Sequence, residues 1–498
     1  MMYNSESIKM RAHNDMKSLP SVDNSNIFLK SAFAVSGSFL KSGEIVGWLQ
    51  KQNESAKVKI QKIRFDQLNS WSLSQNRLAH KSGKFFSIEG IQVNTNWGNV
   101  ASWSQPIINQ SEIGYLGFIT KEFDGILHFL MQAKIEPGNI NYVQLSPTLQ
   151  ATRSNYSQVH KGKKPLYLEY FQNAKHDQIM VDQLQSEQGA RFLRKRNRNI
   201  IIKIDEEIPL YDNFIWLTLG QLKHLMHQDN LINMDTRTVI AGIPYGSYET
   251  NVISIFDYFG NVNHRDTLQQ SFLKSALSVS GSLHTLEETI TFLTHLKSNY
   301  DLLVKQIPLN QIDSWIIGSS EIYHKERKYF KVIAVDVEIG NREVVKWSQP
   351  MVEPVQEGLC AFLCKEINGQ MHFAVQAKLE CGNHDIIEFA PTVQCLTGNY
   401  RETKENRLPF LHYVLNARKD QIVYDTMQSE EGGRFYQEQN RNMIILAGDD
   451  VPDILPDNYI WMTLNQMFTF LKFNNYLNIQ ARSLIAAISF TSPIAGEQ

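Results

Sequence analysis

Two stretches of this chain that lie 244 residues apart have nearly the same sequence, and no other feature constrains the fold as strongly. The segment His128-Phe-Leu-Met-Gln-Ala-Lys-Ile-Glu-Pro-Gly-Asn139 is matched by His372-Phe-Ala-Val-Gln-Ala-Lys-Leu-Glu-Cys-Gly-Asn383, and eight of the twelve residues are identical. The same offset relates Trp103-Ser-Gln-Pro106 to Trp347-Ser-Gln-Pro350. Solenoid and propeller repeats are only about 20–50 residues long, so this repeat belongs to neither class. We predict a tandem duplication of one domain, with folds and sites that come in pairs.

The repeat divides the 498 residues into two copies, each long enough to bury a core of its own. We expect a lead-in at residues 1–27, a first copy at 28–242, a connector at 243–270 and a second copy at 271–490. These boundaries follow the first and last positions at which the two copies can be matched.

Within each copy, the sequence predicts strands between terminal helices. Apolar and polar residues alternate in short segments bounded by Gly and Asn, which is typical of half-buried strands. Opening helices are expected at 41–53 and 286–298, and a closing helix at 216–227. The expected strands of the first copy are 85–93, 114–120, 127–134, 142–145, 166–171 and 199–204. Runs of strands with helices at the ends predict an α+β fold rather than a doubly wound one.

Composition argues against several classes of protein. The net charge of −2 and the pI near 6.7 give no general attraction to nucleic acid or to an anionic membrane. No apolar stretch reaches the length of a membrane span, and the polar N-terminus does not resemble a signal peptide. All four cysteines lie in the second copy without a Cys-x-x-Cys pair, which favours free thiols over zinc or disulfides. We therefore expect a cytoplasmic protein with no nucleic-acid or membrane partner.

The first candidate site lies on the expected strand that ends at Glu136. The two-residue period of a strand places Gln132, Lys134 and Glu136 on one face. An exposed sheet face with a Lys–Glu pair would explain this pattern equally well. Both copies nevertheless keep Gln-Ala-Lys-x-Glu, with Gln376 and Lys378 in the second copy. By contrast, the change from Arg194-Lys195 to Gln437-Glu438 is interpreted as drift at solvent-facing positions.

A second candidate site is the polar segment that follows Pro147. Its hydroxyls, amides and cations suit a polyhydroxylated or phosphorylated ligand, although an ordinary surface loop has the same composition. The second copy repeats Gln150 as Gln394. The candidate residues are Gln150, Thr152, Arg153, Ser154, Asn155, Tyr156, His160 and Lys163.

A third candidate site is the basic run Arg191-Phe-Leu-Arg-Lys-Arg-Asn-Arg198. A single short patch in a neutral protein supports nucleic-acid binding only weakly. Its outer arginines, Arg191 and Arg198, persist as Arg434 and Arg441. Persistent arginines suit a phosphate clamp, and a solvated basic face is the alternative.

Two paired tryptophans are candidates to stack on a base. Trp71 and its counterpart Trp315 each follow a serine, although most tryptophans belong to a core.

Several long segments together resemble the nucleotide-sugar 2,3-dehydratases, enzymes of deoxysugar biosynthesis that act on dTDP-4-keto-6-deoxyglucose. The resemblance extends over nearly the whole chain, and its segments in the first copy are 103–108, 112–117, 128–139, 144–156, 167–171 and 185–199. It implies two Nudix-like α+β domains, each a mixed sheet flanked by helices, in a homodimer without metal or organic cofactor. A downstream ketoreductase would act on the product. The glutamate-rich Nudix helix signature is absent from both copies, which disfavours a metal-dependent diphosphatase.

The reaction that this resemblance implies is a β-elimination. The ketone at C4 acidifies the hydrogen on C3, a base removes it, an acid assists departure of the C2 hydroxyl, and the enol becomes a 3,4-diketone. Glu136 is the expected base, Lys134 the group that stabilises the enolate, and His160 or Tyr156 the acid. Arg153, Lys163, Arg191 and Arg198 would hold the diphosphate. The remaining expected substrate contacts are Trp71, Gln132, Gln150, Thr152, Ser154, Asn155, Gln185, Trp315, Gln376, Lys378, Gln394 and Arg434.

The first copy is the expected catalytic one, because the second lacks counterparts of Arg153, His160, Glu169 and the three central cations of the basic run. Residues of the second copy could still line the working site. The alternatives are a nucleotide-sugar binding protein without catalytic activity, and a metal-dependent nucleotide-sugar diphosphatase.

Overall fold

Both halves of the chain form the same elements in the same order. The computed structural model describes residues 24–37, 39–152, 164–247, 267–340, 345–396, 408–448 and 450–492. The helices of the first half are α2 (Ser25–Phe33), α3 (Ser42–Ser55), α5 (Leu168–Gln172), α6 (Leu219–Leu225) and α7 (Met234–Ala241). Their counterparts are α9 (Thr267–Leu277), α10 (Leu286–Asn299), α11 (Leu411–Leu415), α12 (Leu464–Leu471) and α13 (Ile479–Ala486). Short 3-10 turns lie at Phe65–Gln67, His176–Gln178, Leu309–Gln311 and Lys419–Gln421.

The strands follow the same duplication. Those of the first half are β1 (Val58–Ile63), β2 (Trp71–Leu73), β3 (Arg77–His80), β4 (Ser87–Thr95), β5 (Ser102–Asn109), β6 (Gly114–Phe123), β7 (Ile126–Ile135), β8 (Val143–Ser146), β9 (Leu149–Ala151), β10 (Ile179–Ser186), β11 (Arg196–Lys203) and β12 (Phe214–Thr218). Those of the second half are β13 (Leu302–Ile307), β14 (Trp315–Ile317), β15 (Glu321–His324), β16 (Phe330–Ile339), β17 (Lys346–Pro354), β18 (Gly358–Ile367), β19 (Gln370–Leu379), β20 (Ile387–Ala390), β21 (Val393–Leu396), β22 (Ile422–Ser429), β23 (Gln439–Leu446) and β24 (Tyr459–Met462). The α+β class is confirmed.

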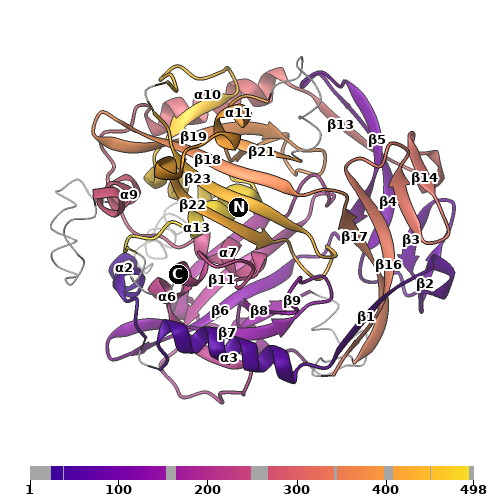
Figure 1. Ribbon diagram of the computed structural model, residues 1–498, viewed down its shortest axis with the longest axis horizontal. Helices are drawn as coiled ribbons and strands as arrows, with labels where there is room; N and C mark the ends of the chain where they lie inside the picture. The colour runs from indigo at the N-terminus through magenta and orange to yellow at the C-terminus, as the bar shows by residue number, and fades with distance from the viewer. Residues whose placement is uncertain are drawn as a thin grey trace, which may run out of the picture.

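Each half has a seven-stranded mixed sheet, and Figure 1 shows the two sheets one above the other on the left. The first has the order β10-β11-β6-β7-β12, with β8 added on β7 and β9 on β6. Strands β6 and β11 are parallel, with Gly114 opposite Asn197, and the other pairs are antiparallel. Alternate residues of β7 enter different apolar clusters: Phe129 and Met131 lie in one and Leu130 in another. The centre of this sheet is therefore buried on both faces, not half-buried as its sequence pattern predicted.

Two smaller sheets lie side by side at the right of Figure 1, and each contains a strand from the other half. Strand β1 of the first half pairs with β16, and β13 of the second half pairs with β4. The remaining order is β4-β3-β2 with β5 in one sheet, and β16-β15-β14 with β17 in the other. The two halves are interlocked by this exchange, so a cut at the expected connector would not separate two complete sheets.

The halves also interlock near the centre, where each presents a glycine to the backbone of the other. A Cβ on Gly138 would lie 1.6 Å from the carbonyl oxygen of Phe435, and one on Gly382 would lie 1.8 Å from that of Phe192. The amide of Gly138 donates to the Gly432 carbonyl at 2.7 Å, and that of Gly382 donates to the Gly189 carbonyl at 2.7 Å. Only residues without a side chain allow this approach.

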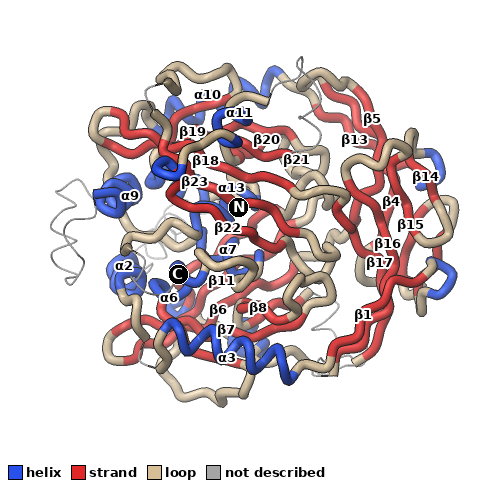
Figure 2. Tube along the Cα trace, in the orientation of Figure 1, coloured by secondary structure: helices blue, strands red, loops and turns tan. Residues whose placement is uncertain are grey.

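Helices cover the seven-stranded sheets and gather away from the small sheets, as α2, α6 and α9 do in Figure 2. The central helices α7 and α13 pack against each other. The Arg482 guanidinium on α13 is buried, and its Nε donates to Thr238 Oγ1 on α7 at 2.7 Å. Among the residues that the structure describes, no helix is long and apolar enough to cross a membrane.

Most of the expected elements are present, but two assignments are wrong. Residues 166–171, expected as a strand, contain the start of helix α5, which follows Tyr167 in a left-handed conformation with φ 62°. The segment expected as a closing helix from residue 216 begins as strand β12 and turns helical only at Leu219. The Thr218 side chain caps that helix by accepting from the Gln221 amide. A short strand followed directly by a helix merges two periodicities, which made the whole segment resemble one helix.

Candidate active site

A cavity of about 330 Å³ lies between the first seven-stranded sheet and the small sheets, within the range of small-molecule sites. Both halves of the chain line it. The first half contributes Trp71, His80, Phe85, Phe86, Gln110, Tyr115, Lys134, Glu136, Gln150, Thr152, Glu187, Lys195, Asn197 and Asp235, and the second contributes Lys346, Trp347, Ser348, Gln349, Glu431, Gly433 and Arg434.

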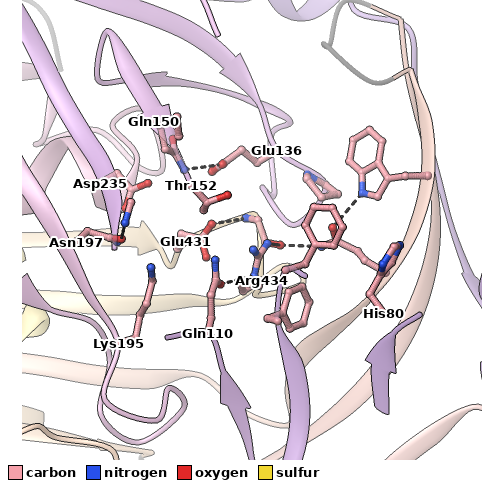
Figure 3. Close-up of a pocket in the computed structure, with 18 of the residues that line it drawn as sticks. His80, Gln110, Glu136, Gln150, Thr152, Lys195, Asn197, Asp235, Glu431 and Arg434 are labelled. Atoms are coloured by element: carbon pink, nitrogen blue, oxygen red, sulfur yellow. Dashed lines mark hydrogen bonds between the residues drawn. The ribbon is translucent and has the colours of Figure 1, made fainter. Parts of the chain in front are cut away.

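Strand β7 brings Lys134 to one side of the cavity, and Glu136 follows at the end of the strand. The Lys134 Nζ lies 3.7 Å from Glu136 Oε1, and both side chains are at least 90% buried. The same Oε1 accepts a hydrogen bond from Gln150 Nε2 at 2.8 Å (Figure 3). Asn233, which caps helix α7, donates through Nδ2 to Gln150 Oε1 at 3.4 Å. A chain of polar contacts therefore runs from the helix to the lysine and fixes its position.

Aromatic rings form another wall of the cavity. The Trp71 ring lies 4.9 Å from that of Phe86 and 5.4 Å from that of His80, measured between centroids. The His80 ring in turn contacts Phe85 edge-on at 4.7 Å. Burial lowers the pKa of His80, so the imidazole is neutral at pH 7. This wall offers flat apolar surface suited to a base or a sugar face.

Arg434 of the second half reaches into this wall. Its guanidinium carbon lies 4.2 Å from the centroid of the Phe86 ring, and its Nε donates to Gln110 Oε1 at 3.2 Å. Arg191, the matching residue of the first half, lies over Phe330 at 4.1 Å. Each half thus contributes an arginine that packs on an aromatic ring in the small sheet of the other half. Arg191 belongs to the second half's site, which corrects its expected place in the first.

A cluster of buried ionisable groups lies deeper in the cavity. The Lys195 side chain is 4% exposed and its ammonium donates to the carbonyl oxygen of Glu112. Burial lowers the pKa of Lys195 to about 8. Burial also raises the pKa of Glu187, whose Oε1 accepts from Asn197 Nδ2 at 2.5 Å. The interpretation of Lys195 as a drifting solvent-facing residue is wrong, because its side chain, just before strand β11, is buried.

Two further carboxylates face the same space from opposite halves (Figure 3). Asp235, in the first turn of α7, is 2% exposed. Burial holds its pKa well above its usual range, and the carboxylates of Glu431 and Glu187 raise it further. Burial raises the pKa of Glu431 to about 7, while Arg434 opposes this shift. Sequence analysis missed both residues, because neither belongs to a recognisable motif.

Some expected contacts lie outside the cavity. Arg198 forms a bidentate pair with Asp182 at 2.7 and 2.6 Å. Arg441 pairs with Asp425 in the same way, at 2.8 and 2.6 Å. This ion pair between neighbouring strands is repeated in both halves, and the place of Arg198 in a phosphate clamp stays a prediction.

Gln132 and Gln185 are also absent from the cavity lining. Gln132 pairs with Ser146 and Phe214 within the sheet. Gln185 is 2% exposed and donates to the Leu471 carbonyl of the second half at 2.9 Å. Glu169, used to favour the first copy, is exposed on α5.

The second half repeats the framework of the site with its own residues. Lys378 Nζ donates to the Gln394 carbonyl at 3.3 Å, and Gln394 Nε2 donates to Glu380 Oε1 at 2.9 Å. Trp315 lies 4.9 Å from the Phe330 ring, as Trp71 does from Phe86. Gln376 is buried in strand β19. The expected residues Arg153, Ser154, Asn155, Tyr156, His160 and Lys163 lie outside the described residues.

The structure also places the four cysteines and the residues that could bind a metal. All four cysteines are free, as the sequence predicted. Burial raises the pKa of the Cys381 thiol to about 12, so this thiol is not reactive at neutral pH. Within the described part of the chain, no group of three or more His, Cys, Asp and Glu residues is arranged to hold a metal ion.

One protein family and three relatives with the same enzyme name match this chain. A model of the NDP-hexose 2,3-dehydratase family matches residues 42–243 and again residues 286–488. A dTDP-4-dehydro-6-deoxy-alpha-D-glucopyranose 2,3-dehydratase of Saccharopolyspora spinosa is 43% identical over 469 residues, which cover 94% of this chain and 95% of the relative. Enzymes with the same name from Amycolatopsis orientalis and Streptomyces violaceoruber are 39% and 40% identical, over 92% and 89% of this chain and 92% and 95% of their own lengths.

Proposed function

This chain belongs to the NDP-hexose 2,3-dehydratase family, and from that premise we propose that it removes water from dTDP-4-dehydro-6-deoxyglucose in the cavity between its halves. The enzyme is a sugar-nucleotide dehydratase, which is a hydro-lyase. The location rests on one observation: buried acids, three lysines and an arginine converge on one cavity that has an aromatic wall.

The reaction requires three functions from the protein. A base takes the proton from C3, an acid donates a proton to the departing C2 hydroxyl, and a donor stabilises the negative charge on the C4 oxygen. The C2=C3 enol that remains becomes a 3,4-diketone after a proton moves to C2. Only water is released, and no atom is oxidised by an external acceptor.

Lys134 is the proposed donor to the enolate oxygen. Its ammonium is only about 10% exposed, and a charge in such a site acts more strongly than in water. Glu136 Oε1 is held between Gln150 and Lys134, and the second half repeats the contact between Glu380 and Gln394. This shared arrangement favours a positioning role for Glu136 over the expected role as base. A single donor to a developing oxyanion contributes about 10²–10³ in rate.

The nucleotide is proposed to lie along the aromatic wall. Trp71 and Phe86 supply apolar surface for the base, and Arg434 supplies a cation for the diphosphate. The first cavity is the proposed site of reaction, since its polar Tyr115 and Thr152 are replaced by Leu359 and Leu396 in the second half.

The proposed enzyme also has an expected fold relationship, assembly, cellular location and reaction partner. The mixed sheets flanked by helices fit a Nudix-like relationship for each half. A homodimer in the cytoplasm, working without metal or organic cofactor, fits the family resemblance. A ketoreductase would consume the labile diketone. Sedimentation of the purified protein tests the dimer, and activity after treatment with a chelator tests the absence of a metal.

The central test is to incubate the enzyme with dTDP-4-dehydro-6-deoxyglucose and a ketoreductase, and to measure product mass. Loss of one water supports the proposal. Binding without loss of water would indicate a binding protein, and magnesium-dependent release of a sugar phosphate would indicate a diphosphatase. Lys134→Ala should lower kcat about 10²–10³-fold, whereas Lys378→Ala should have a much smaller effect.

A further inference from the structure

The first cavity differs from its counterpart at two acidic positions. Helices α7 and α13 start at equivalent caps: Asn233 accepts from the Thr236 amide and Asn478 from the Ala481 amide, both at 2.9 Å. Two residues after each cap, Asp235 is matched by Gln480.

The second difference lies in the segment after β10 and β22. The motif Gln185-Ser-Glu187 corresponds to Gln428-Ser-Glu430, so the next residue is Gln188 in the first half and Glu431 in the second. Glu187 lines the first cavity from its own half, whereas Glu431 is donated to the same cavity by the second half. The donated segment of the first half carries Gln188 in place of this acid. Asp235 and Glu431 are thus replaced by amides at the equivalent positions, which are Gln480 and Gln188.

Residues that occur in both halves cannot explain why the reaction is proposed for the first cavity and not for the second half. Lys134, Glu136 and Gln150 are repeated as Lys378, Glu380 and Gln394. We propose that Asp235 and Glu431 are the acid and the base of the dehydration, with Glu431 removing the C3 proton and Asp235 protonating the C2 hydroxyl. This assignment rests on the proposed function and concerns the same cavity.

The surroundings of each group support its role. Asp235 lines the cavity, and its buried Oδ1 makes no hydrogen bond with any residue that the structure describes. Burial and three neighbouring carboxylates raise the pKa of Asp235 well above its usual range, which favours the protonated form that an acid requires. Glu431 Oε1 accepts from the Gly433 amide at 3.1 Å, and Arg434 stabilises its charged form. These contacts favour the charged form of Glu431, which serves as the base.

One proton shared by this pair is sufficient for a complete cycle. Glu431 takes the proton from C3, and Asp235 gives its proton to the hydroxyl that leaves C2 as water. Glu431 then returns its proton to C2 of the enol, while the enol hydroxyl on C3 gives its proton to Asp235. Both carboxyl groups end as they began, and the sugar has lost one water.

Deuterium exchange separates the two roles. In D₂O, Asp235→Asn should keep base-dependent exchange at C3 of the recovered substrate but lose elimination by at least about 100-fold in kcat. Glu431→Gln should lose both exchange and elimination. KM should change by less than about threefold in both variants, because the lost groups act in the chemical step. Titration with dTDP and thermal unfolding check that each variant is folded.

Glu388→Gln is the matched control, since it also removes a buried carboxylate but lies outside the cavity lining. It should retain exchange and elimination. If either Asp235→Asn or Glu431→Gln kept more than about a tenth of wild-type kcat, the assignment would be overturned. Undiminished C3 exchange in Glu431→Gln would also overturn it. A wild-type enzyme that releases no water would instead overturn the proposed function.

Discussion

The guanidinium of Arg434 lies over the ring of Phe86, with its central carbon 4.2 Å from the ring centroid. These two residues belong to opposite halves of the duplicated chain. The equivalent pair, Arg191 over Phe330, has nearly the same separation of 4.1 Å. The exchange of β1 and β13 between the small sheets accompanies this crossing. Each half therefore completes the site of the other.

Replacing Arg434 by Ala should weaken substrate binding. The variant loses a cation proposed to contact the diphosphate, and charged hydrogen bonds contribute about 1.5–3 kcal/mol. KM for the sugar nucleotide should rise about 10–100-fold, and calorimetry with dTDP should show a parallel loss of affinity. Arg191→Ala removes the matching contact on Phe330, outside the first cavity. A larger rise in KM for Arg191→Ala than for Arg434→Ala would contradict this placement.

The pH dependence of activity should follow Glu431. Burial raises its pKa to about 7, with Glu136 and Glu187 adding to the shift and Arg434 and Lys134 opposing it. A base must be ionised, so kcat/KM should increase as pH rises through about 7 and decrease at higher pH when Asp235 loses its proton.

Initial rates between pH 5 and 9 measure this profile. Glu388→Gln is a useful control, because burial also raises the pKa of Glu388 to about 7. The profile should be unchanged in this variant. Loss of the acidic limb there would mean that Glu388, rather than Glu431, controls the rate.

Glu388 should instead control stability. Its side chain is 1% exposed, and Oε2 accepts from Ser186 Oγ at 2.7 Å. Its pKa is raised from 4.5 to about 7, chiefly by burial. Because the folded pKa is the higher one, its contribution to stability is complete below pH 4.5 and is lost as pH rises through about 7.

The Glu388→Gln variant cannot ionise and should escape that loss. The free energy of unfolding of the variant relative to wild type should therefore increase by about 3 kcal/mol between pH 4.5 and pH 8. Urea unfolding at several pH values measures it. A difference that is constant with pH would show that Glu388 does not titrate in this range.

Gly138→Ala should test how tightly the halves approach each other. The new Cβ would meet the Phe435 carbonyl oxygen at 1.6 Å, a backbone atom that cannot turn aside. We expect a loss of about 3 kcal/mol or more in the free energy of unfolding.

Gly47→Ala on helix α3 is the contrasting substitution, with no heavy atom of the described residues within 4 Å of the added Cβ. It should stabilise the protein by up to about 1 kcal/mol, because alanine favours a helix. Equal effects of the two substitutions on chemical unfolding would argue against a close backbone approach at Gly138.

Several features were predictable because they depend on local periodicity. The alternation along β7 placed Lys134 and Glu136 together, and helix α10 was expected within one residue of its observed end at Asn299. Lys195 was misjudged, because a basic run resembles a solvated surface unless the burial of each side chain is known. The ion pair of Arg198 was not predictable, because its partner, Asp182, lies on a neighbouring strand.

The sequence by itself determined the duplication, the α+β class and the family. These depend on matching residues at a fixed offset and on side-chain periods within single elements. Only the tertiary structure decided that the halves exchange strands and arginines, and that Asp235 meets Glu431 in one cavity. Strand pairing between halves is made by backbone groups, which are alike in every residue, and the burial that tunes a carboxyl group depends on all its neighbours at once.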